Sequence, residues 1–348
     1  MAIKLDLDKA FDKLDWGCIY HSLNFFGFPP CITNIIMHCV SSTSMSVIIN
    51  GNAGIIFQPS RGVRQGDCIS PYLFILILEL LHLQIETEKD QGNWSPLTFG
   101  TSGFSPDCFF ADDIILFGKA DSKTATSITN TLHQFCSWSG QEISLQKSKI
   151  MFSKNTSPSL RSQISNQLQI NETNNLGKYL GFPLKVGRQP SSDFNFILDK
   201  VRNKLQGWKA SSLSLAGRKT LIQATTFAIP NYYCQFTMLP KNICERINKA
   251  NRAFLWSSSQ SKKKIHLVKW SNVTKPTTRG GLGLKSTWEY NKSTMAKLNW
   301  RLLKENKLSW GPLIKAKYFN HAPPNLARPR INQFSSVNAR NLEKGWDV

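Results

Sequence analysis

The 348-residue sequence predicts an α+β fold followed by a basic, helical region. Three observations predict it. Apolar and charged residues alternate from Ala2, and two apolar runs flank the pair Asp112–Asp113. Beyond Gly187, apolar residues recur at helical spacing among lysines and arginines. We therefore expect an α+β region over residues 1–187, a helical region over 188–256 and a basic C-terminal extension over 257–348.

Composition excludes several classes of protein. Hydrophobic residues make up 41% of the chain, which is ordinary for a globular protein, and no stretch of about 18 uncharged apolar residues suggests a membrane span. An N-terminus with aspartates at 6, 8, 12 and 15 is unlike a signal peptide, and the cysteines contain no C-x-x-C pair. These features predict an intracellular protein, nuclear or cytoplasmic and not secreted, without a disulfide framework or a zinc site. They specify no oligomeric state.

Charge is divided unevenly along the chain. Residues 1–150 hold 10 Lys and Arg against 14 Asp and Glu, a net charge of −4, whereas residues 151–348 hold 33 against 8, a net charge of +25. Such a positive region is typical of a surface that binds a polyanion, most often a nucleic acid. A basic surface that only improves solubility is the alternative, but this charge exceeds what solubility needs.

The first 90 residues predict one strand, two helices, a hairpin and a long helix. The strand covers residues 2–11, helices cover 12–29 and 31–44, and a hairpin over 44–62 turns at Asn50–Gly51. A largely buried helix covers 70–88, with Ser70 as its N-cap and Pro71 in its first turn.

The next hundred residues predict strand, turn and strand around Asp112–Asp113, and then a helix over 122–140 that Gly140 ends. Short strands are expected at 148–153 and 178–186.

The aspartate pair raises the question of what balances its charge, because ionised carboxylates are costly to bury without a cation. If the strand of Asp6 and the hairpin of Asp112–Asp113 are neighbours, their carboxylates converge at one edge of the sheet. Magnesium prefers oxygen ligands, and two such ions about 3.5–4 Å apart are a recurring solution for phosphoryl transfer. An exposed, chemically inert Asp-Asp turn is the alternative.

The segment RGVRQGDCISPYLF, at 61–74, is rich in glycine and basic residues and precedes a helix. Gly62 and Gly66 allow close approach of the backbone to a ligand, and exposed N–H groups at a helix start favour phosphate. A simple turn made by Gly and Pro is an equally good interpretation of this segment alone.

Together these segments resemble a reverse transcriptase of the LINE-type (non-LTR retrotransposon) group, which is abundant in plant genomes. KLDLDKAFDKLDW is similar to the first palm motif, D-x-x-x-A-[FY]-D, RGVRQGDCISPYLF to the Gly-rich motif, and FFADDIILF to the [YF]-A-D-D hairpin. SWSGQEISLQKSKIMFS and KYLGFPLKVGR resemble the next two motifs, and the likeness extends through GGLGL over nearly the whole chain.

The resemblance implies a polymerase right hand: a palm with an antiparallel sheet and packed helices plus partial fingers over 1–187, a basic helical thumb over 188–256, and the extension over 257–348. The implied activity is that of an RNA-directed DNA polymerase, a nucleotidyltransferase that adds dNTPs to a primer 3′-hydroxyl with two Mg²⁺ ions, or alternatively Mn²⁺. The implied partners are an RNA template, a DNA primer and dNTPs.

The resemblance also implies roles for particular residues. The catalytic and metal-binding set is Asp6, Asp112 and Asp113, with the Leu7 carbonyl as a further metal ligand and Lys147 as a proton donor to pyrophosphate. The nucleotide and template set is Leu7, Phe11, Arg64, Gln65 and Gly66, and the primer grip is Tyr179, Leu180 and Gly181. Core packing is the alternative for Phe11, and Lys149 could be confused with Lys147.

The sequence departs from the family pattern at three positions: Ser144 stands where Asn is usual, and Gln141 and Glu142 stand where apolar residues are usual. Since Met1 lies just before the catalytic strand, we interpret the chain as N-terminally truncated, without upstream fingers motifs. A catalytically inactive remnant that at most binds nucleic acid is therefore the alternative function. A maturase-like splicing factor is a third reading that no feature of the sequence demands.

Overall fold

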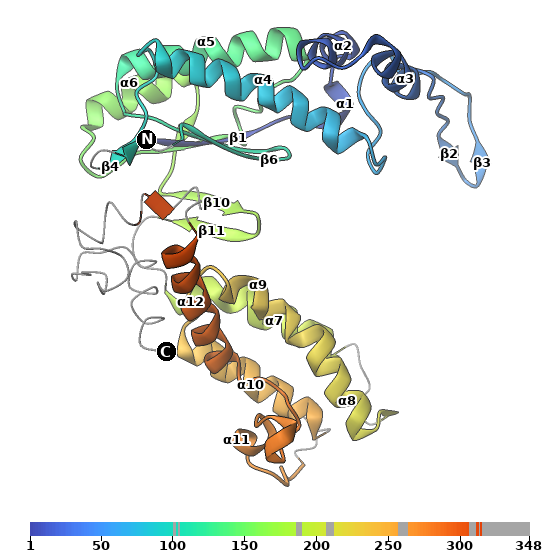
Figure 1. Ribbon diagram of the computed structural model, residues 1–348, viewed down its shortest axis with the longest axis vertical. Coiled ribbons are helices and arrows are strands. Elements are labelled where there is room, and N and C mark those ends of the chain that lie inside the picture. Colours follow the sequence, from blue (N-terminus) through green and yellow to red (C-terminus); the bar gives the residue numbers. More distant parts are fainter. Residues whose placement is uncertain are drawn as a thin grey trace. The chain divides into compact units, whose positions relative to one another are not determined.

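The computed structural model describes residues 1–99, 102–103, 105–185, 190–206, 212–256, 264–305, 311, 312 and 314. The chain divides into two compact units, Met1–Lys185 and Val186–Val348 (Figure 1). Gly187, at the predicted end of the first region, lies outside the described residues.

A five-stranded sheet with strand order β6-β7-β1-β8-β9 forms the centre of the first unit. Its strands pair antiparallel except for β8 and β9, which are parallel. The strands are β1 (Ala2–Asp6), β6 (Asp107–Phe110), β7 (Asp113–Phe117), β8 (Lys149–Met151) and β9 (Asn171–Glu172). Although β1 comes first in the chain, it occupies the middle of the sheet.

The alternation predicted for the first strand is confirmed. Ile3, Leu5 and Leu7 are buried in the hydrophobic core, whereas Lys4 and Asp6, on the other face of the strand, are partly exposed. A one-residue slip would exchange these faces, so burial of the apolar set fixes the register of β1. The charged face of the sheet is thereby kept accessible.

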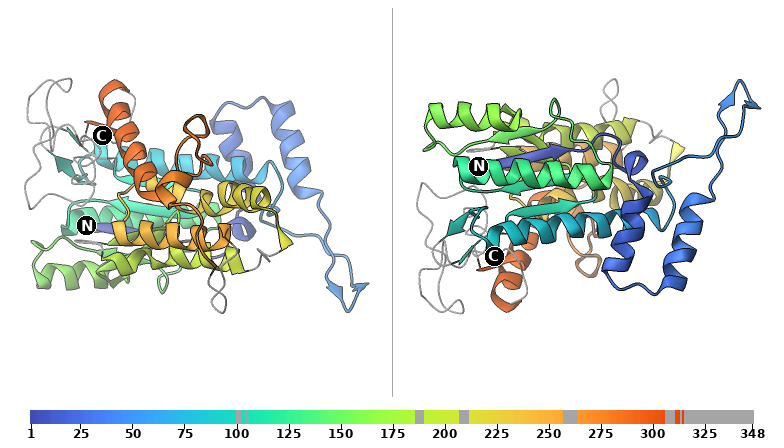
Figure 2. Two further views of the ribbon diagram at one scale, coloured as in Figure 1. Left: turned by 90° about the horizontal axis from the view of Figure 1, so that it is seen from below. Right: turned by 90° about the horizontal axis from the view of Figure 1, so that it is seen from above.

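The described part of the first unit also contains six helices. They are α1 (Ala10–Lys13), α2 (Trp16–Phe25), α3 (Pro30–Ser41), α4 (Ser70–Asp90), α5 (Ser122–Ser139) and α6 (Pro158–Leu168). Figures 1 and 2 show α4 and α5 running along the same side of β1. Ile77 and Leu81 of α4 and Phe135 of α5 join β1 in one buried cluster. This α+β arrangement is the predicted fold class.

Two predicted turns are confirmed by their backbone angles. Asn50 and Gly51, with φ of 50° and 85°, connect β2 (Ile48–Ile49) to β3 (Asn52–Ala53). Positive φ at both central residues is what a two-residue hairpin turn of type I′ needs. Helix α5 ends at Gly140, whose φ is 73° and whose N–H donates to the Cys136 carbonyl.

Other details of the prediction were wrong. Ser70 is not the N-cap of α4, because Ile69 precedes the helix and the Ser70 hydroxyl instead donates to the Arg64 carbonyl at 2.7 Å. The segment expected as one strand at 178–186 belongs to a hairpin, β10 (Asn175–Tyr179) and β11 (Phe182–Lys185). Its turn has φ of 49° at Leu180 and 79° at Gly181. A short hairpin of β4 (Thr98–Phe99) and β5 (Ser102–Gly103) and helix α6 were not predicted.

Helices dominate the described part of the second unit, as their apolar spacing predicts. They are η1 (Ser191–Phe194), α7 (Asn195–Gln206), α8 (Leu215–Leu221), the π-helical η3 (Ile222–Thr226), α9 (Ala228–Cys234), α10 (Lys241–Leu255), α11 (Trp270–Val273), η4 (Thr277–Arg279) and α12 (Thr287–Lys304).

A buried asparagine fastens α12 within this unit. The Asn291 amide donates to the carbonyls of Cys234 and Thr237 at 3.0 and 2.9 Å and accepts from the Leu239 N–H at 2.6 Å. Residues on both sides of position 256, where the helical region was expected to end, also share a core. Phe254 and Leu255 pack there with Val273 and Leu284. Among all described helices, none has the length and apolarity needed to cross a bilayer.

Candidate active site

The candidate site lies where the end of β1 meets the beginning of β7. Asp6 and Asp113 are direct cross-strand partners in the antiparallel β1–β7 pair, and Asp112 occupies the turn between β6 and β7. The expected neighbourhood of the two strands is therefore confirmed. Directly opposed residues in such a pair have Cβ atoms about 4.5–5.5 Å apart, so both carboxylates belong to one small region.

The turn that carries Asp112 is strained. Ala111 has a φ of 49°, a left-handed conformation that residues with a Cβ atom rarely adopt. Such strain costs of order 1–3 kcal/mol and persists only where the surrounding structure imposes it. Here the β6–β7 ladder imposes it, with Phe110 paired to Asp113 across the turn. Asp112 is left exposed at the tip.

Two lysines balance the charge of these carboxylates. Lys4 Nζ lies 3.0 Å from Asp113 Oδ1, and Lys147 Nζ lies 3.7 Å from Asp6 Oδ1. Both ion pairs are partly exposed, with the Asp6 and Asp113 side chains 43% and 35% accessible. A ligand in solution can therefore reach both carboxylates. The ligand atoms of Asp6, Asp112 and Asp113 do not form a trio within 4.8 Å of one another.

The chain after α5 forms hydrogen bonds with the last residue of β1. The Asp6 carbonyl accepts from the Ser144 N–H at 2.8 Å, and the Asp6 N–H donates to the Ser148 hydroxyl at 3.1 Å. An isolated bridge pairs Leu7 with Ile143. Lys147 meets Asp6, whereas Lys149 lies on β8 opposite Lys4.

Gln141 and Glu142, which depart from the family pattern, make specific polar contacts. The buried Gln141 amide donates to the Ala10 carbonyl at 2.8 Å, and the Glu142 carboxylate lies 2.6 Å from Lys13 Nζ. Lys13 also binds Asp8 at 2.8 Å, and hydrogen bonding to Lys13 lowers the pKa of the Asp8 carboxyl. Gln141 and Glu142 thus make polar contacts with the chain that follows β1.

The Gly-rich segment packs against the turn that follows β1. The N–H groups of Gly62 and Val63 donate to the carbonyls of Leu14 and Phe11 at 2.7 and 2.8 Å. Gly62 has a φ of 86°, and a Cβ atom there would lie 2.5 Å from the Asp12 carbonyl oxygen. Only glycine fits this contact.

The predicted nucleotide-side residues lie close to this contact. Phe11 is half-buried and stacks on Phe74 of α4, with ring centroids 5.0 Å apart and an interplanar angle of 25°. Arg64, Gln65 and Gly66 are exposed beside it, and Gly66 has a φ of 90° with open space where a Cβ would project.

The β10–β11 hairpin contacts β6 and β1. The Tyr179 hydroxyl lies 3.3 Å from Cys108 Sγ on β6, and Lys4 Nζ donates to the Lys178 carbonyl at 2.5 Å. Burial raises the pKa of the Tyr179 phenol above its ordinary value. Leu180 and Gly181 form the turn at the tip of this hairpin.

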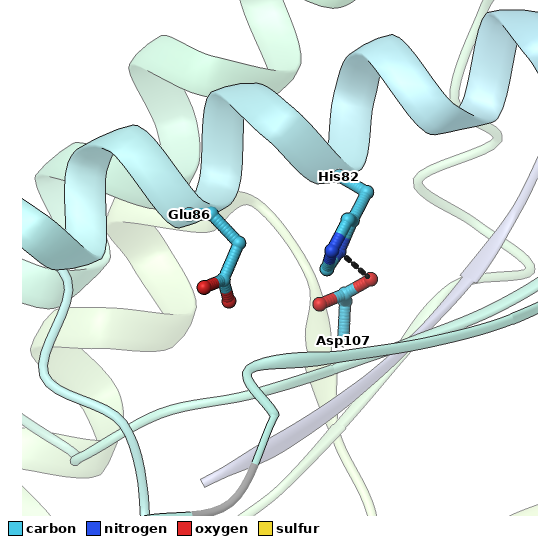
Figure 3. Close-up of side chains that lie close together, drawn as sticks. All are labelled: His82, Glu86 and Asp107. Carbon is cyan, nitrogen blue, oxygen red and sulfur yellow. Dashed lines mark hydrogen bonds and ion pairs between the residues drawn. The ribbon is translucent and has the colours of Figure 1, made fainter.

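A second polar cluster escaped the sequence analysis. His82 and Glu86 of α4 and Asp107 of β6 place ligand atoms within 4.8 Å of one another (Figure 3). It is the one group of three metal-ligating side chains found among the described residues. The helical i, i+4 spacing of His82 and Glu86 was a visible signal, but their meeting with Asp107 depends on the tertiary fold.

Comparison with known proteins places the chain in a family. The family model described as "Reverse transcriptase (RNA-dependent DNA polymerase)" matches residues 1–184. A "Putative ribonuclease H protein" of Arabidopsis thaliana is 38% identical over 136 residues, which are 39% of this chain and 22% of that protein. The retrovirus-related Pol polyprotein from the type-2 retrotransposable element R2DM of Drosophila melanogaster is 29% identical over 143 residues, 41% of this chain and 13% of that protein.

The matched segments thus span less than two thirds of either relative. Among solved structures, telomerase from Candida albicans in complex with a TWJ fragment of telomeric RNA aligns with a TM-score of 0.40 at 12% identity, covering 90% of this chain and 50% of that one. The family match covers more than half of the chain, and the retrotransposable-element relative agrees with the LINE-type resemblance. The chain therefore belongs to the reverse transcriptase (RNA-dependent DNA polymerase) family.

Proposed function

We propose that this chain is the reverse transcriptase domain of a non-LTR retroelement and extends a DNA primer on an RNA template. The observation that carries the proposal is the register of β1 and β7, which pairs Asp6 with Asp113 beside the exposed Asp112. Family membership supports it as well.

The donor set fits divalent magnesium. Asp6, Asp112 and Asp113 offer carboxylate oxygens, and the carbonyl of Leu7, the residue directly after β1, offers a further oxygen. Oxygen-only, partly hydrated sites suit Mg²⁺, and Mn²⁺ accepts the same ligands. Two bound ions would supply activation of the primer 3′-hydroxyl and neutralisation of charge on the departing pyrophosphate.

The remaining predicted residues have positions that suit their proposed roles. The Phe11 ring, held by Phe74, would lie under the incoming sugar and select deoxynucleotides, while exposed Arg64, Gln65 and Gly66 would contact the nucleotide and template. The exposed Lys147 ammonium would donate a proton to pyrophosphate.

The β10–β11 hairpin is proposed as the primer grip, with Tyr179, Leu180 and Gly181 at its turn. Its contacts with Lys4 and Cys108 support this role, because they tie the hairpin to β1, which carries Asp6, and to β6, which pairs with the strand of Asp113. The helical region over 188–256 is proposed as the thumb, followed by the extension over 257–348. The positive charge downstream of residue 150 supports contact with a duplex backbone.

Primer extension tests the proposal directly. The purified chain is given poly(rA)/oligo(dT), dTTP and Mg²⁺, beside the double variant Asp112→Asn/Asp113→Asn. We expect extension by the parent chain and loss of at least 100-fold in the variant, because removal of the carboxylates removes the metal ligands. Asp90→Asn, an exposed carboxylate at the end of α4, serves as the control and should keep the parent rate.

Binding to the same duplex is measured by fluorescence anisotropy in parallel. Binding without extension by the parent chain would favour a catalytically inactive remnant. Extension that survives in the Asp112→Asn/Asp113→Asn variant would overturn the assignment of the site.

A further inference from the structure

The cluster of His82, Glu86 and Asp107 lies apart from the polymerase carboxylates. Asp107 begins β6, and the turn bearing Asp112 lies at the other end of that strand. His82 Nδ1 is 2.9 Å from Asp107 Oδ2, and Figure 3 shows the Glu86 carboxylate turned toward the same space from the next turn of α4. The cluster is therefore a separate group of side chains from the polymerase carboxylates.

The Asp107 side chain is buried, and the basic side chain that it meets is His82. The Asp107 side chain is only 6% accessible, its Oδ1 accepts from the Ser105 hydroxyl at 3.1 Å, and its Oδ2 faces His82. It forms no ion pair with a lysine or arginine of the described residues. A carboxylate so far removed from water needs a cation or several hydrogen bonds to be stable. Glu86, the second carboxylate, has Lys89 as its partner.

The three donors match the ligand preferences of a transition-metal ion. Imidazole nitrogen suits zinc and related metals, while carboxylate oxygen is accepted by zinc and manganese. Ligands bound about 2.1 Å from one ion lie roughly 3–4 Å from one another. Because the present ligand atoms all lie within 4.8 Å, modest side-chain rotations would bring them onto one ion.

We propose that His82, Glu86 and Asp107 form a structural site for a divalent transition-metal ion such as Zn²⁺ or Mn²⁺. On binding, the imidazole proton moves from Nδ1 to Nε2, and the Nδ1 lone pair replaces the hydrogen bond to Asp107 with a bond to the metal. The Ser105 hydroxyl holds the other Asp107 oxygen, as outer-sphere partners of metal ligands do. The ion would join α4 to β6, the strand that leads into the turn of Asp112.

Cobalt(II) is a suitable probe because its spectrum distinguishes thiolate from nitrogen and oxygen ligands. The full chain is stripped of metal with a chelator, supplied with excess Mg²⁺ to fill oxygen-only sites, and titrated with Co²⁺. We expect one equivalent to bind with visible d–d bands and without thiolate charge transfer, although the chain has exposed cysteines. Thermal unfolding in the same buffers should show a higher Tm with the metal.

Near-isosteric variants locate the ion. His82→Asn, Glu86→Gln and Asp107→Asn should each weaken Co²⁺ binding by on the order of tenfold or more and abolish the rise in Tm. His133→Asn on α5 and Glu79→Gln on α4 change exposed residues of the same type and should bind as the parent does. Circular dichroism of the chelated variants checks that each one folds.

Three outcomes would overturn the proposal: no stoichiometric Co²⁺ binding, a spectrum dominated by thiolate, or affinity that is unchanged in Glu86→Gln. Any of them would leave a His–Asp hydrogen bond as the role of the cluster. Because these measurements need no template or dNTP, their failure is distinct from failure of the proposed polymerase function.

Discussion

Lys4 is the residue through which the candidate active site is joined to the β10–β11 hairpin. Its ammonium group meets both the Asp113 carboxylate and the Lys178 carbonyl. The side chain projects from the same face of β1 as Asp6, so its position follows from the register of that strand. The sequence revealed the aspartates but not this lysine, because its partners come from strands more than a hundred residues away.

Replacing Lys4 by Met should change the metal requirement of the site. Without the ammonium, Asp113 would be more available to a cation, and we expect the Mg²⁺ concentration for half-maximal primer extension to fall about two- to fivefold, which corresponds to roughly 0.4–1 kcal/mol for a partly exposed ion pair. A Mg²⁺ titration of the extension rate measures this. Lys123→Met, whose amine binds the Gly92 carbonyl instead, is the matched control. An unchanged requirement in Lys4→Met would contradict the prediction.

Replacement of Gly62 by alanine should destabilise the fold. The φ of 86° at Gly62 and the 2.5 Å approach of a Cβ to the Asp12 carbonyl add a steric clash to the strain of a left-handed alanine. Gly92→Ala, at a φ of 72° with nothing within 4 Å, has the strain alone. We expect Gly62→Ala to lower the free energy of unfolding by about 2 kcal/mol more than Gly92→Ala does, measured by urea denaturation. Equal losses of unfolding free energy in Gly62→Ala and Gly92→Ala would show that the Gly-rich segment moves away from Asp12 without cost.

At the scale of elements, ion pairs stabilise the turn after β1. Lys13 binds both Asp8 and Glu142 and so joins the exit of the central strand to the chain after α5. The strand, the hairpin at Asn50–Gly51 and the end of α5 at Gly140 were predictable, since each depends on local conformational preference. The Lys13 contacts were not, since they join residues that only the sheet brings together.

Acid should weaken this connection. The pKa of Asp8 is lowered by its hydrogen bond to Lys13, so its stabilising contribution is complete above the ordinary carboxyl pKa of about 3.9 and is lost as the pH falls through the lower folded value. Lys13→Met should remove this contribution, leaving a variant whose stability falls less steeply with acid below about pH 4. Urea unfolding from pH 6 to pH 2.5 tests it, with Lys123→Met as control. Parallel acid profiles for parent and Lys13→Met would contradict it.

At the scale of the whole molecule, the two units differ in charge. Residues 186–348 hold 29 Lys and Arg against 7 Asp and Glu, a net charge of +22, whereas residues 1–185 are nearly balanced at 14 against 15. Composition alone made this contrast predictable. Sequence could not predict that Asn291 of α12 would satisfy three backbone groups of the α9–α10 region, because a lone buried amide has no sequence signature.

This charge predicts salt-sensitive binding of nucleic acid. The logarithm of the binding constant should fall linearly with the logarithm of salt concentration, with a slope of about −0.9 for each duplex phosphate contacted. Lys241→Gln/Lys249→Gln on α10 should make the slope shallower, whereas Lys119→Gln/Lys123→Gln in the first unit should not. Fluorescence anisotropy on an RNA–DNA duplex across a salt series measures both. A slope near zero for the parent chain would contradict phosphate contact.

The central position of β1 has a consequence for folding of the chain during its synthesis. Ala2 pairs with Phe117 on one side and with Met151 on the other, so this strand leaves the ribosome long before either neighbour exists. Until then its two edges and its apolar side are open to wrong partners, a hazard for slowly completed sheets. Nascent chains that end before residue 117 should therefore need chaperones to stay soluble. Chains that extend beyond residue 151 contain both partners of β1 and should not need them.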